Sequence, residues 1–209
     1  MVELGADGFE AAAAEIAGRD PAMGRVIAAV GPPLLRPPME SAFAALVRSI
    51  TFQQLAGRAA AAIHARLVSA LGDGGTPEAV LALPEPAFRA AGLSGAKTAS
   101  IRDLAAKVVD GTVPLQAIEA LSDDEVIERL SRVRGIGRWT AEMFLIFHLR
   151  RPDVWPVDDL GVRKGYALAH GLAVPPKPRE LMVLGERYRP HRTVAAWYCW
   201  LAAETVVPD

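Results

Sequence analysis

The sequence predicts an all-α fold from three observations. The chain has 209 residues, of which 51% are hydrophobic, so it can bury one large core or two smaller ones. Alanine clusters at residues 11–14 and 59–62, together with few β-branched runs, favour helix over strand. The 16 prolines and 18 glycines are spread along the chain and divide it into short segments. Together these features predict many short helices separated by turns.

Proline, glycine and capping residues set the expected helix boundaries. Asp20 followed by Pro21 is typical of an N-cap and a first helical residue, so we expect a helix from there to about Val30. The proline-rich residues 31–38 predict a linker. The remaining pattern predicts a short helix after Pro77 and helices over residues 8–18, 39–53, 57–71, 84–91, 96–109, 115–121, 156–170, 179–187 and 191–204.

Cysteine, histidine and apolar patterns exclude several classes of protein. Cys199 is the only cysteine in the sequence, which excludes a four-cysteine iron–sulfur cluster and an internal disulfide framework. The histidines lack metal-ligand spacing, so we expect no metal at His64, His148, His170 or His191. No apolar run reaches the roughly 18 residues of a membrane span. The first residues, MVELGADGFE, also lack the basic region of a signal peptide, so we expect a cytoplasmic protein without membrane contact.

The charge balance is nearly neutral but uneven. The formal net charge is −1 at pH 7, which counts against the strongly basic character of many DNA-binding domains. Basic residues are nevertheless concentrated toward the C-terminal end, at Arg129, Arg132, Arg134, Arg138, Arg150, Arg151, Arg163, Lys164, Arg187, Arg189 and Arg192. If the fold gathers them on one side, a basic face results; otherwise they are scattered, solvated charges. Composition alone leaves both arrangements open.

The most specific pattern is a pair of helices joined by a very short turn. Residues 122–125, Ser-Asp-Asp-Glu, form a capping box that starts the first helix. Apolar stripes are expected on both helices, at Val126, Ile127, Leu130 and Val133, and then at Trp139, Met143, Ile146 and Phe147. Between them lie residues 134–138, Arg-Gly-Ile-Gly-Arg, in which both glycines permit positive φ and Ile136 can fill the gap between the helices. N–H groups at the start of the second helix can then bind a phosphate, although such a turn also occurs in plain helix packing.

The wider sequence resembles a known superfamily. Residues 130–141, Leu-Ser-Arg-Val-Arg-Gly-Ile-Gly-Arg-Trp-Thr-Ala, are similar to the helix-hairpin-helix of base-excision DNA glycosylases, and Asp158 and Asp159 follow where that family carries an aspartate at a helix start. Residues 43–60 and 188–200 are similar to segments of the alkylpurine, or 3-methyladenine, DNA glycosylases. The resemblance implies an all-α fold of two lobes with the active site in the cleft between them. The expected lobes are a helical bundle of residues 41–154 and a second lobe of residues 1–40 plus 155–209.

The same resemblance implies an activity. Alkylpurine glycosylases flip a damaged purine of the 3-methyladenine or 7-methylguanine type out of duplex DNA and hydrolyse its N-glycosidic bond, which initiates base excision repair. We therefore expect double-stranded DNA with damaged bases as the partner, and a monomer of the bacterial cytosol that associates with the nucleoid when bound. No cofactor is expected to be required, although hairpin carbonyls in this superfamily often hold a monovalent cation. Two alternatives are a non-catalytic helix-hairpin-helix DNA-binding module and a glycosylase for oxidised or mismatched bases.

The resemblance also assigns roles to residues. Asp159 is expected to stabilise positive charge on the sugar, with Asp158 as the alternative catalytic residue, a helix cap or a second carboxylate. The base pocket is expected to contain Trp139, Trp200 and Met143, the last where the best-known relatives carry tyrosine. Trp139 also stands where strand-cutting members carry a lysine, so we expect monofunctional chemistry. The residues expected to contact DNA are Arg134, Gly135, Ile136, Gly137, Arg138 and Thr140, and also Gln53 and Gln54, which either fill the gap left by the flipped base or simply end a helix.

Overall fold

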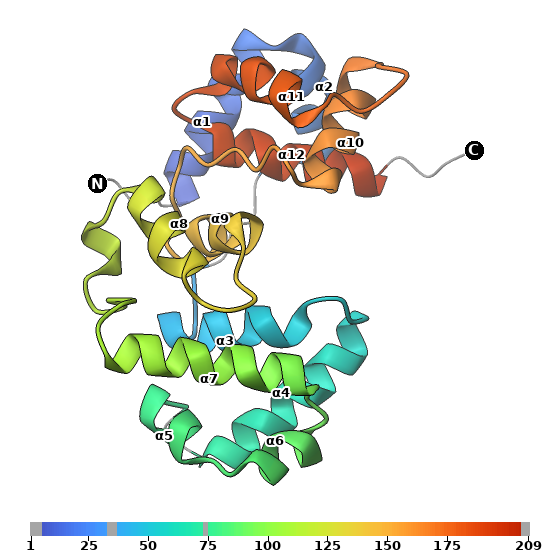
Figure 1. Ribbon diagram of the computed structural model, residues 1–209. Helices are drawn as coiled ribbons and strands as arrows, with labels where there is room; N and C mark the ends of the chain where they lie inside the picture. The colour runs from blue at the N-terminus through green and yellow to red at the C-terminus, as the bar shows by residue number, and fades with distance from the viewer. Residues whose placement is uncertain (1–5, 33–36, 73–74, 206–209) are drawn as a thin grey trace. The chain divides into compact units, whose positions relative to one another are not determined.

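The computed structural model describes residues 6–32, 37–72 and 75–205, and every regular element in these ranges is a helix (Figure 1). The all-α prediction is therefore confirmed. The chain divides into two compact units, one of residues 1–37 and 145–209 and the other of residues 38–144. The second division falls inside helix α9 (Arg138–Phe147), whereas the sequence analysis placed it after residue 154. In the described ranges, no helix has both the length and the apolar character of a membrane span.

The unit of residues 38–144 is a helical bundle that contains the hairpin. Its elements are α3 (Ala42–Phe52), α4 (Gly57–Leu71), α5 (Pro77–Ala82), α6 (Glu85–Ala91), α7 (Gly95–Val109), the 3₁₀ turn η2 (Ile118–Ala120), α8 (Asp123–Ser131) and most of α9. Helix α4 packs on α3 and α6, while α7 packs on α3 and α5 (Figure 1). The fully buried side chains include Leu46, Leu67, Phe88 and Leu104, so one apolar core lies among these helices.

Side-chain caps define where several of these helices start. The Oγ of Ser41 accepts from Ala44 N–H, and that of Ser94 accepts from Lys97 N–H. At α8 the expected capping box is present, because Ser122 Oγ accepts from Glu125 N–H while Glu125 accepts from Ser122 N–H. Such caps satisfy N–H groups that have no partner within the helix. The start of the hairpin's first helix is therefore set by residues local in sequence.

The unit of residues 1–37 and 145–209 is built around two closely packed helices, α10 and α12. Its elements are α1 (Ala6–Arg19), α2 (Pro21–Val30), α10 (Leu160–His170), α11 (Pro178–Gly185), the 3₁₀ turn η3 (Glu186–Tyr188) and α12 (Arg192–Thr205). A Cβ at Gly165 of α10 would overlap the backbone of Cys199 on α12. The absence of a side chain at Gly165 therefore lets the two backbones touch, and α1 and α2 also pack against α12.

A buried carboxylate joins α2 to the C-terminal helices. Asp20 caps α2 through Ala22 N–H and Met23 N–H, and its other oxygen accepts from Tyr188 Oη at 2.6 Å and lies 2.9 Å from His170 Nε2. Burial alone would raise the pKa of Asp20, but the hydrogen bonds from Tyr188 and His170 outweigh it and hold that pKa well below its ordinary value. The carboxylate is therefore ionised in the folded protein at neutral pH.

Several sequence expectations need correction. Residues 115–121 form no α-helix but only the 3₁₀ turn at residues 118–120. The helix expected after Pro156 begins at Leu160, because Asp159 caps it. The second apolar stripe of the hairpin is not fully buried, since Trp139 is 46% and Phe147 is 40% exposed. In the expected linker, residues 33–36 lie outside the described residues.

Candidate active site and nucleic-acid interface

The turn between α8 and α9 depends on one left-handed residue. Helix α8 ends at Ser131 and α9 begins at Arg138. Gly135 has a φ of +77°, and a Cβ at this position would lie 2.6 Å from Ser100 Oγ. Both the backbone conformation and the available space therefore require glycine. Ile136 is buried, as the sequence predicts.

The second glycine of the turn, Gly137, has a different role. Glycine permits a positive φ here, but Gly137 does not adopt one. A Cβ there would meet no heavy atom of the described chain within 4 Å. Packing within the described protein therefore does not require glycine at position 137. The space above this part of the backbone is open to a ligand.

Asp103 on α7 holds one side of the turn. Its Oδ2 accepts a hydrogen bond of 2.7 Å from Arg134 N–H, and both of its oxygens lie 2.6 Å from Lys107 Nζ. Burial alone would raise the pKa of Asp103, but the hydrogen bonds and the charges of Lys107 and Arg134 hold it below its ordinary value. An ionised carboxylate therefore ties the turn to α7.

Gln53, just after α3, holds the other side of the turn. Its Nε2 donates to Gly135 O at 2.9 Å and to Thr140 Oγ1 at 3.4 Å. The backbone carbonyl oxygen of Gln53 accepts a hydrogen bond of 2.8 Å from Lys97 Nζ, so the end of α3 is itself anchored to α7. Gln54 is exposed and has a φ of +56°, a conformation uncommon for residues other than glycine. Of the two glutamines, Gln53 is bound within the protein and Gln54 lies at the surface of the loop.

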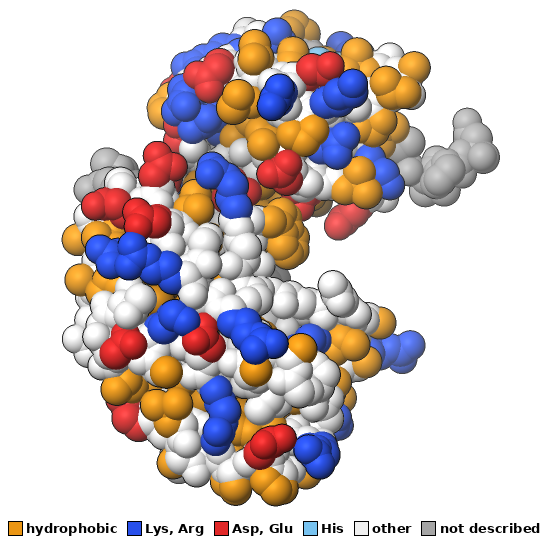
Figure 2. Space-filling model, in the orientation of Figure 1, with side chains coloured by type: hydrophobic (Ala, Val, Ile, Leu, Met, Phe, Trp, Pro, Cys, Tyr) orange, Lys and Arg blue, Asp and Glu red, His pale blue; other side chains and the backbone are white. Residues whose placement is uncertain are grey.

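Basic residues near the C-terminal end are mostly paired or buried. Ion pairs join Arg132 to Glu128, Arg138 to Glu142, Arg187 to Asp20, and both Arg189 and Arg192 to Asp153. Arg150 and Arg151 are buried. On the face drawn in Figure 2, lysine and arginine side chains alternate with acidic ones. Most of these basic residues are therefore engaged within the protein by ion pairs or burial.

The carboxylate of Asp159 lies at the start of α10 and receives two hydrogen bonds on one oxygen. Asp159 is the N-cap of α10, and its Oδ1 accepts from Val162 N–H at 2.8 Å and from Trp200 Nε1–H at 2.9 Å. The side chain is partly exposed. Asp158 precedes it in a turn and is exposed, so its expected role as the helix cap is wrong. Two residues assigned to the site by sequence, Asp159 and Trp200, are thus in direct contact.

Phe147 and Trp197 complete an aromatic cluster around Trp200. The rings of Phe147 and Trp200 are stacked, with centroids 5.7 Å apart and an interplanar angle of 25°. The rings of Trp197 and Phe147 form a T-shaped pair with centroids 6.4 Å apart. Trp155 is buried, and its Nε1–H donates to Leu181 O. Sequence reasoning placed Phe147 only in an apolar stripe and missed its contact with Trp200. The available signal was an aromatic residue in the last turn of the hairpin's second helix.

A family profile described as HhH-GPD superfamily base excision DNA repair protein matches residues 47–190, which is more than half of the chain and spans the hairpin and Asp159. The chain belongs to the HhH-GPD superfamily. Its all-helical architecture and its hairpin agree with this assignment, which also confirms the family expected from residues 130–141.

The HhH-GPD protein is similar to characterised members along most of its length. It is 42% identical over 158 residues to DNA-3-methyladenine glycosylase 1 of Schizosaccharomyces pombe, which covers 74% of this chain and 69% of the relative. A solved structure of the 3-methyladenine DNA glycosylase of that yeast in complex with abasic DNA matches with a TM-score of 0.79 and 37% identity, covering 91% of this chain and 95% of that one. The DNA-3-methyladenine glycosidase of Bacillus halodurans matches with a TM-score of 0.84 and 34% identity, covering 98% and 94%. The predicted fold is therefore confirmed.

Two further residues expected in the base pocket of this HhH-GPD protein belong to the unit of residues 38–144. Trp139 is on the first turn of α9 and is 46% exposed, and Met143 is half-buried one turn further along. Asp159 and Trp200 belong to the other unit. Within the described residues, no cluster of three or more histidine, cysteine, aspartate or glutamate side chains is arranged to hold a metal ion.

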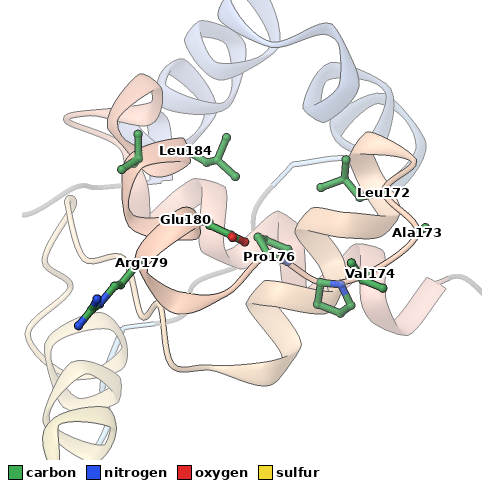
Figure 3. A pocket seen from close by; sticks show the side chains of 9 residues that line it. Leu172, Ala173, Val174, Pro176, Arg179, Glu180 and Leu184 are labelled. Atoms are coloured by element: carbon green, nitrogen blue, oxygen red, sulfur yellow. The ribbon is translucent and has the colours of Figure 1, made fainter.

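The unit of residues 1–37 and 145–209 also has an apolar groove. It lies between the end of α10 and α11, has a volume of about 710 Å³, and is lined by Leu172, Ala173, Val174, Pro175, Pro176, Arg179, Glu180, Val183 and Leu184 (Figure 3). None of the residues that the sequence assigned to catalysis, base binding or DNA binding lines it. The groove therefore shares no lining residue with the candidate active site.

Proposed function

We propose that this HhH-GPD protein is a monofunctional DNA glycosylase that hydrolyses the N-glycosidic bond of alkylated purines in duplex DNA. The expected substrates are bases of the 3-methyladenine type, which the names of its relatives print, and, from the family resemblance, bases of the 7-methylguanine type. The observation that carries the proposal is the carboxylate of Asp159, which is held at a helix N-terminus by Val162 N–H and Trp200 Nε1–H. We further propose that the enzyme acts as a monomer in the bacterial cytosol.

In the proposed reaction Asp159 stabilises positive charge on the sugar. When the bond between C1′ and the purine nitrogen breaks, the electron pair leaves with the base and the sugar becomes cationic. Water then adds its oxygen to C1′ and loses a proton to solvent, which leaves an abasic site. A carboxylate held in place by hydrogen bonds needs no reorganisation as charge develops on the sugar. Asp158, exposed in the preceding turn, is the second candidate for this role.

Aromatic side chains are proposed to bind the extruded base. Trp139 and Trp200 would stack on it, and Met143 would line the same pocket. Cationic alkylated purines add a cation–π attraction of roughly 0.5–2 kcal/mol to such stacking. The ring of Phe147 already covers one face of Trp200, so a base would stack on the other. A cationic base is also an activated leaving group, so little hydrogen-bonding specificity is needed.

The hairpin is proposed to bind the DNA backbone. The open space at Gly137 allows a phosphate to approach N–H groups at the start of α9, where the helix dipole favours an anion. Arg134 and Arg138 would flank this phosphate, and Gln54 would enter the gap left by the flipped base. The side chain of Thr140 is buried and accepts a hydrogen bond from Gln53, so its expected contact with DNA is not proposed. A monovalent cation would be held by turn carbonyls: those of Val133 and Gly135 already accept one hydrogen bond each, and a carbonyl oxygen has two lone pairs.

The positions of Lys97, Lys107 and Lys164 support monofunctional chemistry. A strand-cutting glycosylase forms a Schiff base through an amine, and Trp139 stands where such members carry that lysine. Lys97 and Lys107 are bound to protein oxygens. Lys164 is exposed on α10, five residues beyond Asp159, so it does not lie on the same helix face.

The experiment is base release from duplexes that contain a single 7-methylguanine or 3-methyladenine. We expect free base and an intact strand with an abasic site, which breaks only after hot alkali or an added endonuclease. Borohydride should trap no protein–DNA adduct, because only an imine can be reduced to one. Absence of base release would refute the glycosylase proposal, while unaided nicking together with a borohydride adduct would refute the monofunctional one.

A further inference from the structure

The N-terminal turn of α10 leaves a gap that the Trp200 indole occupies. Gly161 is the second residue of α10, and a Cβ at this position would lie 2.8 Å from Trp200 Cδ1, 3.2 Å from Trp200 Nε1 and 3.1 Å from Asp159 Oδ1. Separations of this size between a Cβ and a rigid ring are not tolerated without movement of the ring. The absence of a side chain at 161 is therefore what permits the hydrogen bond between Trp200 and Asp159.

The indole has little freedom to move aside if the gap is filled. On one face it is stacked against Phe147, with ring centroids 5.7 Å apart. Its Nε1–H points at Asp159 Oδ1 at 2.9 Å. A side chain at 161 would push on the edge that carries this N–H group. Such a side chain would therefore break the hydrogen bond from Trp200 to Asp159.

Stacking on a base does not require the indole N–H group of Trp200. A stacking wall needs only an aromatic face, which phenylalanine also supplies, whereas a hydrogen bond to Asp159 needs the indole N–H. An aspartate N-cap is ordinarily completed by the backbone N–H two or three residues later, and Val162 N–H already provides it. Trp200 adds a second donor from a different helix, α12, to the same oxygen. Two donors from different directions fix the rotation of the carboxylate, which one donor does not.

We propose that Trp200 and Gly161 are positioning residues for Asp159. Trp200 Nε1–H holds Oδ1 and thereby directs the carboxylate toward the reacting sugar, and Gly161 leaves the space in which the indole does so. The inference rests on the proposed function, because it assigns these residues to the same reaction. Trp200 then has two roles: the face of its ring stacks on the base, and its N–H group holds the Asp159 carboxylate.

The first test is Trp200→Phe, which keeps an aromatic ring against Phe147 and removes the N–H donor. Since hydrogen bonds to charged groups are the stronger kind, we expect kcat for 7-methylguanine release to fall roughly 10- to 100-fold. KM and the affinity for abasic DNA should stay within a few-fold. A rise in KM with kcat unchanged would overturn the proposal, because it would mean that Trp200 acts only by stacking on the base.

The second test is Gly161→Ala, with Gly18→Ala as the matched control. Gly18 lies in α1, and a Cβ there would meet nothing within 4 Å among the described residues. We expect Gly161→Ala to lower kcat as Trp200→Phe does, and Gly18→Ala to leave kcat unchanged. Equal kcat for Gly161→Ala and the wild type would overturn the role of Gly161.

A spectroscopic test detects the contact without relying on activity. The sequence has four tryptophans, so a ¹⁵N–¹H spectrum should contain four indole signals, and the one that disappears in Trp200→Phe belongs to Trp200. We expect that signal to shift in Asp159→Asn and in Gly161→Ala, but not in Asp158→Asn or Gly18→Ala. If wild-type protein releases no base but the signal responds in this way, the proposed function fails and the contact stands. If base is released but the Trp200 indole signal does not shift in Asp159→Asn, the positioning proposal fails.

Discussion

The side-chain amide of Gln53 donates a hydrogen bond of 2.9 Å to the carbonyl oxygen of Gly135. A residue that the resemblance places at the gap left by a flipped base is thus used inside the protein to support the hairpin. Gln54, next to it, is exposed with a positive φ of 56°. Such backbone costs of the order of 1 kcal/mol for residues other than glycine and is often found at functional sites. The two glutamines should therefore differ in function.

The first prediction separates these glutamines. Gln53→Ala removes the support of the turn, so it should lower stability by about 1 kcal/mol and weaken binding to damaged and undamaged DNA alike. Gln54→Ala should leave stability unchanged and reduce base release. Thermal unfolding, duplex binding and single-turnover base release on both variants would measure this. If Gln53→Ala lost base release at unchanged stability while Gln54→Ala released base as the wild type does, the assignment of the two glutamines would be reversed.

The second prediction concerns the glycines of the turn. Gly137→Val should weaken binding to every duplex to a similar extent, because its side chain blocks a phosphate that carries no base information. Since a Cβ at 137 meets nothing in the described protein, its unfolding temperature should stay close to that of the wild type. Gly135→Ala is the contrasting variant: with φ at +77° and Ser100 Oγ at 2.6 Å, it should lose at least about 1 kcal/mol of stability.

Salt titration of binding would test the Gly137→Val prediction further. Loss of one phosphate contact should reduce the salt dependence of the binding constant as well as the affinity. A variant that binds undamaged duplex normally but fails only on lesions would contradict the proposed role of the hairpin.

The third prediction follows from the buried carboxylate of Asp20. Asp20→Ala removes a helix cap and leaves Tyr188 Oη without its acceptor, so we expect a loss of about 2–4 kcal/mol near pH 7. The pKa of Asp20 is lowered in the folded protein. Its stabilising effect is therefore complete above the unfolded-state pKa, about 3.9, and declines as the pH falls below it.

Denaturant unfolding at several pH values would check this dependence. The difference in unfolding free energy between wild type and Asp20→Ala should shrink progressively as the pH falls below about 4. A difference that stays constant from about pH 4 down to pH 2, or one that grows over that range, would show that the ionised carboxylate is not what stabilises this unit.

Local sequence was sufficient for much of the fold. Asp20 with Pro21 and the box at Ser122 set helix starts correctly, because a cap satisfies N–H groups within its own segment. The prediction for residues 115–121 was wrong: their apolar side chains fit a helix, but only a 3₁₀ turn forms, in which Ile118 is buried. Burial of an apolar side chain in a turn gives the same apolar pattern as a short helix, so a window of ten residues does not distinguish the two.

The candidate site was predictable in its residues but not in its contacts. The resemblance named Asp159, Trp200 and Gln53 from motifs. What each side chain bonds to depends on partners 41 residues away for Trp200 and 82 residues away for Gln53, so spacing along one helix could not reveal either hydrogen bond. Gly161 was likewise invisible in sequence, because its importance comes from an indole on another helix.

The last prediction decides between the two adjacent aspartates. Asp159→Asn keeps the size of the side chain and an oxygen that can cap α10 but removes the negative charge, so we expect base release to fall by at least about 100-fold. Asp158→Asn should retain activity within a few-fold, because Asp158 is exposed and is not the cap of the helix. Single-turnover base release from a 7-methylguanine duplex would measure both variants.

Binding to a duplex with an abasic analogue is the control for Asp159→Asn. The carboxylate acts on charge that develops as the bond breaks and does not contact phosphates, so the affinity of Asp159→Asn for this duplex should stay within a few-fold of wild type. Loss of binding would mean that the substitution disturbs the DNA surface rather than the chemistry. Full activity in Asp159→Asn together with an inactive Asp158→Asn would transfer the catalytic role to Asp158, and the contact between Trp200 and Asp159 would then serve packing alone.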